Sequence, residues 1–225
     1  MEKRPRSAYQ KKMKHYDDVI TGRKWWSWLY MNLLWRTDDN RIARRILEMI
    51  PDVFSGEILD VPVGTAVFTY AKYLRMQNAR IIGLDYSEEM LRLASERIRK
   101  ESLSNLTLLQ GDVRQMPFGE ECFDCVLSMS GFQAFPDKDL AFAEIYRVLK
   151  VGGLFCGCFY VQGERPVADW FVRNVLDRKG LFVPPHYTRR EALEKLHSLF
   201  GKNVEIEGHG STMIFRCIKP PKEDL

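Results

Sequence analysis

Short runs of apolar residues alternate with amphipathic helical segments along most of this 225-residue chain. A short apolar run bounded by turn residues is typical of a strand buried on both faces, whereas the segments between the runs have apolar side chains at helical spacing. Strands that are joined through helices run parallel, because the crossover returns the chain to the same end of the sheet. The predicted strands are residues 56–64, 79–85, 106–112, 123–129, 154–160, 204–210 and 212–219.

Helices are predicted between these strands. Ser87 and Thr188 are residue types that favour the N-cap position, and we expect Pro51 and Gly152–Gly153 to end helices. The last two strands have no helix between them and are expected to pair antiparallel at the sheet edge. The predicted fold is therefore an α/β, Rossmann-like, doubly wound, seven-stranded and mostly parallel sheet with an antiparallel edge pair and helices on both faces. The predicted helices are residues 39–50, 66–76, 87–102, 139–150, 167–178 and 188–201.

Composition narrows the class of protein. The chain is 45% hydrophobic and 28% charged, which is the balance of a globular domain, and its length suits one large domain. A net charge of +4 is too small to indicate a nucleic-acid partner by itself. No window approaches the ~20 apolar residues of a membrane span, and no secretory signal is expected. Five cysteines, in a domain large enough to fold without disulfides, favour a cytoplasmic protein.

Residues 1–38 precede the alternating pattern, so we interpret them as an extension to a main domain at 39–225. Residues 1–24 carry eight lysines and arginines against three acidic residues, and residues 16–36 are rich in aromatic side chains. We expect this stretch to act as a lid over the site or to pack on the domain. Weak contact with a membrane surface is less favoured, because the apolar residues do not share one helical face.

Acidic residues stand at the ends of three successive predicted strands. They are Asp60, Asp85 and Asp112. A doubly wound sheet binds its ligand outside the carboxyl ends of its strands, and an acidic residue that ends the second strand accepts hydrogen bonds from ribose hydroxyls. A single aspartate after a strand is as often a turn residue. The prediction of a nucleoside site therefore depends on the three residues together.

Five segments carry a resemblance to a known family. They are LDVPVGTA, GLDYSEEML, GDVRQMPF, FDCVLSMSGFQAFPD and EIYRVLKVGGLF, all between about residues 40 and 160. In this order and spacing they resemble the motifs of the class I S-adenosylmethionine-dependent methyltransferases, in particular the small-molecule branch that includes ubiquinone and menaquinone biosynthesis enzymes. The resemblance implies methyl transfer from S-adenosylmethionine to a small-molecule acceptor.

The resemblance also implies a cofactor site. Asp60 would bind the methionine ammonium group, Asp85 the ribose hydroxyls and Asp112 the adenine amine. The other positions that it implies are Val61, Pro62, Gly64, Thr65, Tyr86, Gly111, Val113 and Ser128.

Two residues depart from the family pattern. Pro62 stands where the family usually has its first glycine, and Ala66 stands where it has the third. Proline fixes φ and has no N–H group, so the turn loses a donor at that point. We expect an altered but competent site.

The methyl acceptor is not identified, although aromatic residues around the site would suit a planar, quinone-like molecule. Gln133 is the favoured residue for positioning or deprotonating it, because the loop after the fourth strand faces the methyl donor in this fold. Residues 161–187 are interpreted as a substrate-side insertion. The other candidates for acid–base chemistry are His186, Tyr187, Tyr16 and His15, and the expected walls are Phe132, Phe135, Phe159, Trp170 and Phe171.

Two other functions stay open. An NAD-dependent oxidoreductase would share the acidic residue after the second strand, but it expects a Gly-x-Gly-x-x-Gly turn, of which only Gly64 is present. A non-catalytic module that binds an adenosyl ligand is kept open by Pro62. The pairs Cys122–Cys125 and Cys156–Cys158 fall in or beside predicted strands, where side chains alternate faces and the members of a pair are not held in knuckle geometry, so we expect no metal. The oligomeric state is left open.

Overall fold

The computed structural model describes residues 39–221. The predicted extension at residues 1–38 lies outside the described residues. Our predictions that it acts as a lid, packs on the domain or contacts a membrane therefore concern residues that the structure does not describe. Tyr16 and His15 lie there too.

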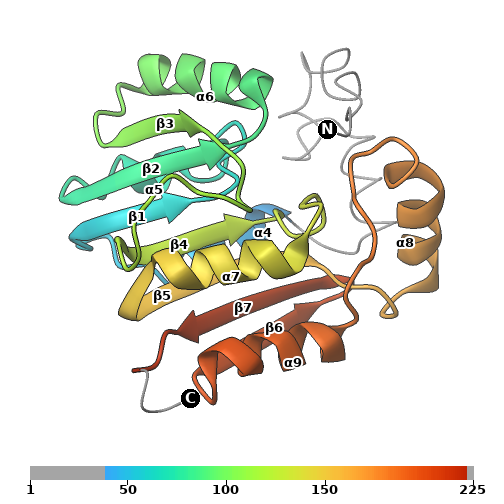
Figure 1. The fold of residues 1–225 in the computed structure, drawn as a ribbon. Helices are drawn as coiled ribbons and strands as arrows, with labels where there is room; N and C mark the ends of the chain where they lie inside the picture. The colour runs from blue at the N-terminus through green and yellow to red at the C-terminus, as the bar shows by residue number, and fades with distance from the viewer. Residues whose placement is uncertain (1–38, 222–225) are drawn as a thin grey trace.

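Seven strands form a single sheet in the order β3-β2-β1-β4-β5-β7-β6 (Figure 1). Strands β1 to β5 run parallel to one another, and β7 runs antiparallel between β5 and β6. The predicted mostly parallel sheet with an antiparallel edge pair is confirmed. The strand order reverses between β1 and β4, so their carboxyl ends form the switch point at which such sheets bind ligands. The strands are β1 (Gly56–Asp60), β2 (Ala79–Asp85), β3 (Leu106–Gln110), β4 (Phe123–Met129), β5 (Leu149–Tyr160), β6 (Val204–His209) and β7 (Thr212–Ile218).

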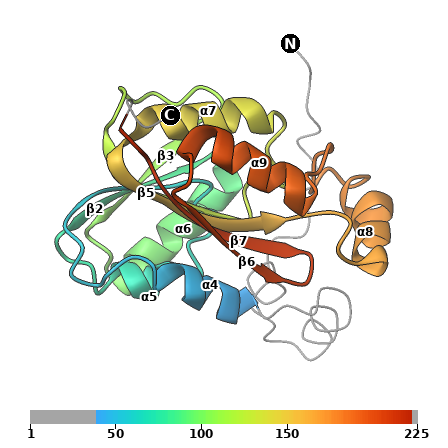
Figure 2. The ribbon, with the colours of Figure 1, turned by 90° about the horizontal axis from the view of Figure 1, so that it is seen from below.

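Helices cover both faces of the sheet (Figure 2). On one face lie α4 (Asp39–Leu47), α5 (Tyr70–Tyr73) and α6 (Glu88–Glu101), and on the other lie α7 (Lys138–Val148) and α9 (Arg189–Phe200). The helical turns α8 (Pro166–Phe171) and η3 (Val172–Leu176) stand beyond the carboxyl ends of the parallel strands (Figure 1). None of the helices within residues 39–221 has the length and apolar character needed to cross a bilayer.

Phenylalanine side chains form much of the core between the sheet and helices α7 and α9. The rings of Phe132 and Phe142 stack with their centroids 4.0 Å apart, and those of Phe155 and Phe215 lie 4.6 Å apart. Phe132 and Phe159 are 0% and 2% exposed and belong to this core. Our expectation that these two residues line the acceptor site is therefore wrong, because packing across the sheet buries both rings.

The segment after β1 contains less helix than predicted. We expect a helix over residues 66–76, but the structure has only the single turn α5. Ala66 has a φ of +56°, a left-handed conformation that cannot continue a right-handed helix. Hydrogen-bonded turns therefore occupy residues 66–69.

The start of β5 also differs from the prediction. Gly152 and Gly153 lie inside β5 and do not end the preceding helix, since α7 stops at Val148. The backbone of both glycines is paired with Lys219: the Gly152 N–H donates to the Lys219 carbonyl (2.8 Å), and the Lys219 N–H donates to the Gly153 carbonyl (3.1 Å). The chain therefore enters the strand five residues earlier than the apolar run indicates, with a register shift against β4.

Both predicted helix caps are confirmed. The Ser87 hydroxyl accepts a hydrogen bond from the Met90 N–H at 3.3 Å, and it caps α6. Thr188 and Glu191 form a reciprocal capping box at the start of α9. These caps satisfy backbone N–H groups at the N-termini of α6 and α9, and so stabilise the first turn of each helix.

Candidate functional site

The loop after β1 is joined to the end of β2 through Asp85. The Gly64 N–H donates to one oxygen of this carboxylate at 2.9 Å, and the Ser87 N–H donates to the other at 2.8 Å. The Val63 N–H donates to the carbonyl of Leu84 at 3.0 Å. Asp85 is only 7% exposed, and burial raises its pKa. The structure thus brings together the predicted residues Gly64 and Asp85.

Asp60 lies buried at the end of β1 beside Tyr73. The Tyr73 hydroxyl donates a hydrogen bond to Asp60 Oδ2 at 2.7 Å, and the two residues are 1% and 0% exposed. Burial raises the pKa of Asp60 to about 7, the bond from Tyr73 opposes this rise, and the charge of Asp85 adds to it. The carboxyl group therefore exchanges its proton near neutral pH. Nothing in the sequence singles out Tyr73 as the partner.

Gly64 provides open space within the loop. It has a φ of +56°, and a Cβ placed on it would meet no atom of residues 39–221 within 4 Å. The neighbouring Thr65 is buried, and its carbonyl accepts a hydrogen bond from Arg97 of α6. The loop is therefore fixed on one side and leaves room for a ligand against the Gly64 backbone.

Pro62 packs against the loop that follows β4. A Cβ on Gly131 would lie 2.5 Å from Pro62 Cδ, 2.6 Å from Phe135 Cζ and 2.8 Å from Ser128 Oγ, so only glycine fits among these three side chains. Gly131 thus makes the room that a proline at position 62 needs. This contact explains how the departure from the family pattern is accommodated.

Ser128 offers a polar group near this contact. It is fully buried, and its Oγ has no hydrogen-bond partner among residues 39–221. A buried hydroxyl without a partner is uncommon and points to a missing polar group.

Asp112 follows β3 and is bound by Arg114. The Arg114 guanidinium donates to both carboxylate oxygens, at 2.6 Å from Nη2 and 3.0 Å from Nε. An adenine amine would therefore have to share this carboxylate with Arg114. Gly111 is tied to β2 through the Asp85 carbonyl at 3.0 Å, and Val113 is buried. Tyr86 is 60% exposed, as a residue that lies along a ligand ring would be before binding.

Gln133, in the loop after β4, is hydrogen-bonded to β5 and to the segment before His186. Its side-chain Oε1 accepts a hydrogen bond from the Tyr160 N–H at 3.2 Å, and its carbonyl accepts one from the Val183 N–H at 2.7 Å. The side-chain NH₂ group makes no hydrogen bond to the other residues in the range 39–221.

His186 and Tyr187 belong to different clusters. His186 packs on Tyr160 with 5.3 Å between ring centroids, and its Nε2 lies 2.9 Å from Asp177 Oδ1. The Tyr187 hydroxyl instead donates to Asp139 of α7 at 3.2 Å. The structure therefore does not bring these two predicted residues together, and Asp177 is a partner that the sequence did not indicate.

The two predicted wall residues on α8 differ in exposure. Trp170 is 60% exposed, whereas Phe171 is partly buried beside the small apolar cluster of Tyr160, Ala168, Val172 and Leu176. Of the two, only Phe171 packs against this cluster.

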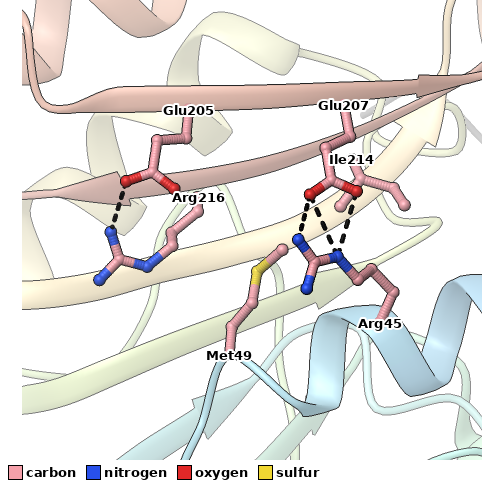
Figure 3. A pocket seen from close by; sticks show the side chains of 6 residues that line it. All are labelled: Arg45, Met49, Glu205, Glu207, Ile214 and Arg216. Atoms are coloured by element: carbon pink, nitrogen blue, oxygen red, sulfur yellow. Dashed lines mark hydrogen bonds and ion pairs between the residues drawn. The ribbon is translucent and has the colours of Figure 1, made fainter.

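A separate hollow of about 220 Å³ lies between α4 and the β6–β7 pair (Figure 3). Arg45 pairs with Glu207, and Arg216 pairs with Glu205 at 3.1 Å. Because these charges satisfy one another and none of the lining residues comes from the ends of β1, β2 or β4, we assign no ligand to this hollow. Within residues 39–221, no three metal-ligating side chains gather.

Comparison with known proteins places this geometry in context. The family model described as "Methyltransferase domain" matches residues 58–153. A demethylmenaquinone methyltransferase of Listeria welshimeri is 30% identical over 172 residues, which is 73% of this chain and 69% of that protein. One from Thermobifida fusca is 38% identical over 108 residues, 48% of this chain and 45% of that protein. This chain thus spans about half the length of several curated relatives that it matches.

Solved structures share the fold. Phosphoethanolamine N-methyltransferase 2 of Haemonchus contortus, in complex with S-adenosyl-L-methionine, superposes with a TM-score of 0.71 at 19% identity, over 95% of this chain and 59% of that one. A putative S-adenosyl-L-methionine-dependent methyltransferase of Methanococcus maripaludis gives a TM-score of 0.65 at 20% identity over the whole of both chains.

Proposed function

This chain belongs to the class I S-adenosylmethionine-dependent methyltransferase family, and from that premise we propose that it transfers a methyl group from S-adenosylmethionine to a quinone-like small molecule. The observation that carries the proposal is the pair of buried carboxylates at the Gly64 turn: Asp60 ends β1 before the turn, and Asp85 accepts the Gly64 N–H.

The residues present fit the cofactor. Asp60 would hold the ammonium group of the methionine portion, Asp85 the ribose hydroxyls, and Ser128 Oγ a polar group that residues 39–221 do not supply. When bound, S-adenosylmethionine supplies a methyl group already activated by the sulfonium charge. The protein's own part is therefore to align the acceptor and to exclude water.

The acceptor would lie beneath residues 161–187, which we propose as the substrate-side insertion. Phe171, Phe182 and the Tyr160 ring form an aromatic cluster there, beside Gln133. Such a lining suits a planar ring with few charges. The names of the matched relatives, demethylmenaquinone methyltransferases, support a quinone-like acceptor.

The alternatives gain less support. In an NAD-binding site the backbone after β1 receives a pyrophosphate, and the buried carboxyl of Asp60 would repel that group. A module that binds an adenosyl ligand without catalysis would need no polar groups on the acceptor side, where Gln133 and His186 lie.

All five cysteines are free thiols, which supports our proposal of a reducing, cytoplasmic location.

Calorimetry with S-adenosylmethionine, S-adenosylhomocysteine and NAD tests the cofactor. We expect the first two to bind and NAD not to bind. A chain that binds neither adenosyl compound would refute the proposal. Methylation assays with a soluble demethylated naphthoquinol, with and without the cofactor, then separate an enzyme from a binding module.

A further inference from the structure

His186 and Asp177 form a largely buried pair beneath α8 and η3. His186 Nε2 lies 2.9 Å from Asp177 Oδ1, and the two side chains are 4% and 15% exposed. A carboxylate can only accept a hydrogen bond, so Nε2 carries the hydrogen. In the neutral ring, the other nitrogen, Nδ1, is then an acceptor.

Nδ1 lacks a donor. It is buried, and no hydrogen-bond partner for it exists among residues 39–221. A buried acceptor left unpaired destabilises the folded protein. Asp177 meanwhile holds the ring in the tautomer that keeps the Nδ1 lone pair available. This arrangement suits a nitrogen that receives its donor from a ligand.

The ring lies beside the proposed acceptor position. Its centroid is 5.3 Å from that of Tyr160 and 6.0 Å from that of Phe182. The Tyr160 N–H donates to the Gln133 side chain, and the Val183 N–H donates to the Gln133 carbonyl. Hydrogen bonds therefore connect the loop after β4 to the segment that holds His186. An aromatic acceptor stacked in this cluster would bring a ring hydroxyl near Nδ1.

We propose that His186 Nδ1 accepts the proton of a hydroxyl group on the methyl acceptor, and that Asp177 positions the ring for this step. This inference rests on the proposed function. The acceptor O–H bond breaks, its electron pair stays on oxygen, and an N–H bond forms at Nδ1. The electron pair of the resulting anion then forms a bond from a ring carbon to the methyl group that S-adenosylmethionine would supply, and the electron pair of the C–S bond would go to sulfur. Loss of that carbon's proton to water restores the aromatic ring as an aryloxide, and Nδ1 returns its proton to the aryloxide oxygen.

The charged groups around the ring favour this role. Burial lowers the pKa of His186, and Lys138 of α7 lowers it further, whereas Asp177 and Asp169 raise it. The neutral ring is therefore present near pH 7, and the imidazolium formed in the step meets the Asp177 carboxylate. Lys138 itself is held by the carbonyl of Val183 at 2.7 Å, and burial lowers its pKa to about 8.

Replacing His186 by glutamine tests the proposal on the full-length chain. Glutamine can accept a hydrogen bond but cannot take the proton. We expect H186Q to lose about 10²- to 10³-fold in kcat with the naphthoquinol, with little change in KM. The matched control is H209Q, on β6, which should leave both constants unchanged. A kcat within twofold of the wild-type value would overturn the proposal.

A second readout does not depend on turnover. With ¹⁵N-labelled histidine, adding the phenolic probe 1-naphthol should move the Nδ1 resonance of His186 and leave that of His209 unchanged. An Nδ1 resonance that does not respond, as expected if a buried water already fills the position, would overturn the proposal.

The positioning role of Asp177 has its own signature. Because Asp177 raises the pKa of His186, D177N should lower that pKa and move the acid limb of the kcat/KM profile to lower pH, with a reduced plateau. An unshifted profile would remove Asp177 from the proposal. Unchanged binding of S-adenosylhomocysteine by these variants keeps the test separate from a failure of the proposed function, in which the wild-type chain itself would not bind it.

Discussion

Asp60 and Tyr73 form a buried pair behind the proposed methionine position. Their hydrogen bond of 2.7 Å keeps the pKa of Asp60 lower than burial alone would set it. In Y73F this pKa should rise above about 7. Less Asp60 is then ionised at pH 7, and the ammonium group loses its counter-charge.

We therefore expect Y73F to bind S-adenosylhomocysteine about tenfold more weakly at pH 7, with the loss shrinking at pH 9, since a hydrogen bond to a charged group is worth about 1.5–3 kcal/mol. Calorimetry across this range measures it, with Y146F on α7 as the control. A loss independent of pH would mean that Tyr73 does not act through Asp60.

Gln133 allows its acceptor and donor roles to be separated. Its Oε1 is engaged by the Tyr160 N–H, so Q133E keeps that bond but replaces the NH₂ donors with a second carboxylate oxygen at a position that is 9% exposed. If the donors position the acceptor, turnover should fall at least tenfold while S-adenosylhomocysteine affinity stays near wild type, and thermal unfolding measures the separate cost of the buried carboxyl group. Steady-state kinetics with calorimetry would decide this, and an unchanged kcat would reject Gln133 as a positioning residue.

Single residues were predictable where their place follows from the ends of strands. Asp60 and Asp85 could be named because parallel strands bring their carboxyl ends to one edge. Tyr73 and Asp177 could not, since each is chosen by packing between segments far apart in sequence. Phe132 and Phe159 show the same limit: the aromatic composition was visible, but the face of the sheet that buries them was not.

Among the elements, the loop after β1 is the one that a ligand would contact. Gly64 and Gly152 both have positive φ, +56° and +76°, and in the described part of the chain a Cβ on either would meet no atom within 4 Å. Alanine at either position should therefore cost about 1 kcal/mol of unfolding free energy through the backbone conformation alone. Only the Gly64 methyl group would project into the proposed cofactor space.

We expect G64A and G152A to have similar urea midpoints, and only G64A to lose affinity for S-adenosylhomocysteine, by tenfold or more. Equal affinities in the two variants would show that no ligand approaches the Gly64 backbone.

Element boundaries were predictable where side-chain pattern and backbone agree. β2 and β4 match their apolar runs, and Ser87 and Thr188 begin helices as expected. The helix at 66–76 was overestimated, because its apolar spacing does not reveal that Ala66 adopts positive φ. The start of β5 was missed because pairing with Lys219, distant in sequence, extends the strand through two glycines.

At the scale of the whole molecule, the alternating pattern was enough to predict the sheet, since parallel connections leave few ways to order the strands. Because β7 lies between β5 and β6, β6 is the edge strand, and α9 lies on the same face of the sheet as α7. The acceptor was not predictable. Residues 161–187, which we propose to cover it, make hydrogen bonds to β5 and to the loop after β4, and these bonds are set by tertiary packing.

The buried site should also cost the molecule stability. A carboxyl group whose pKa is raised by folding, here from 3.8 to about 7, binds its proton more tightly in the folded state. Its contribution to stability is present at low pH and is lost as the pH rises through that window. Asparagine at position 60 removes the titration and can still accept the bond from Tyr73.

At pH 8, D60N should therefore unfold at a higher temperature than the wild type, because its unfolding free energy should be larger by up to about 4 kcal/mol. At pH 4 the two proteins should unfold at similar temperatures. It should also fail to bind S-adenosylhomocysteine, as expected where a functional group is kept at the expense of stability. Thermal unfolding at both pH values measures this. If D60N is less stable than the wild type at pH 8, the free protein must already stabilise the ionised carboxylate. Asp60 would then not depend on a cationic ligand for its counter-charge.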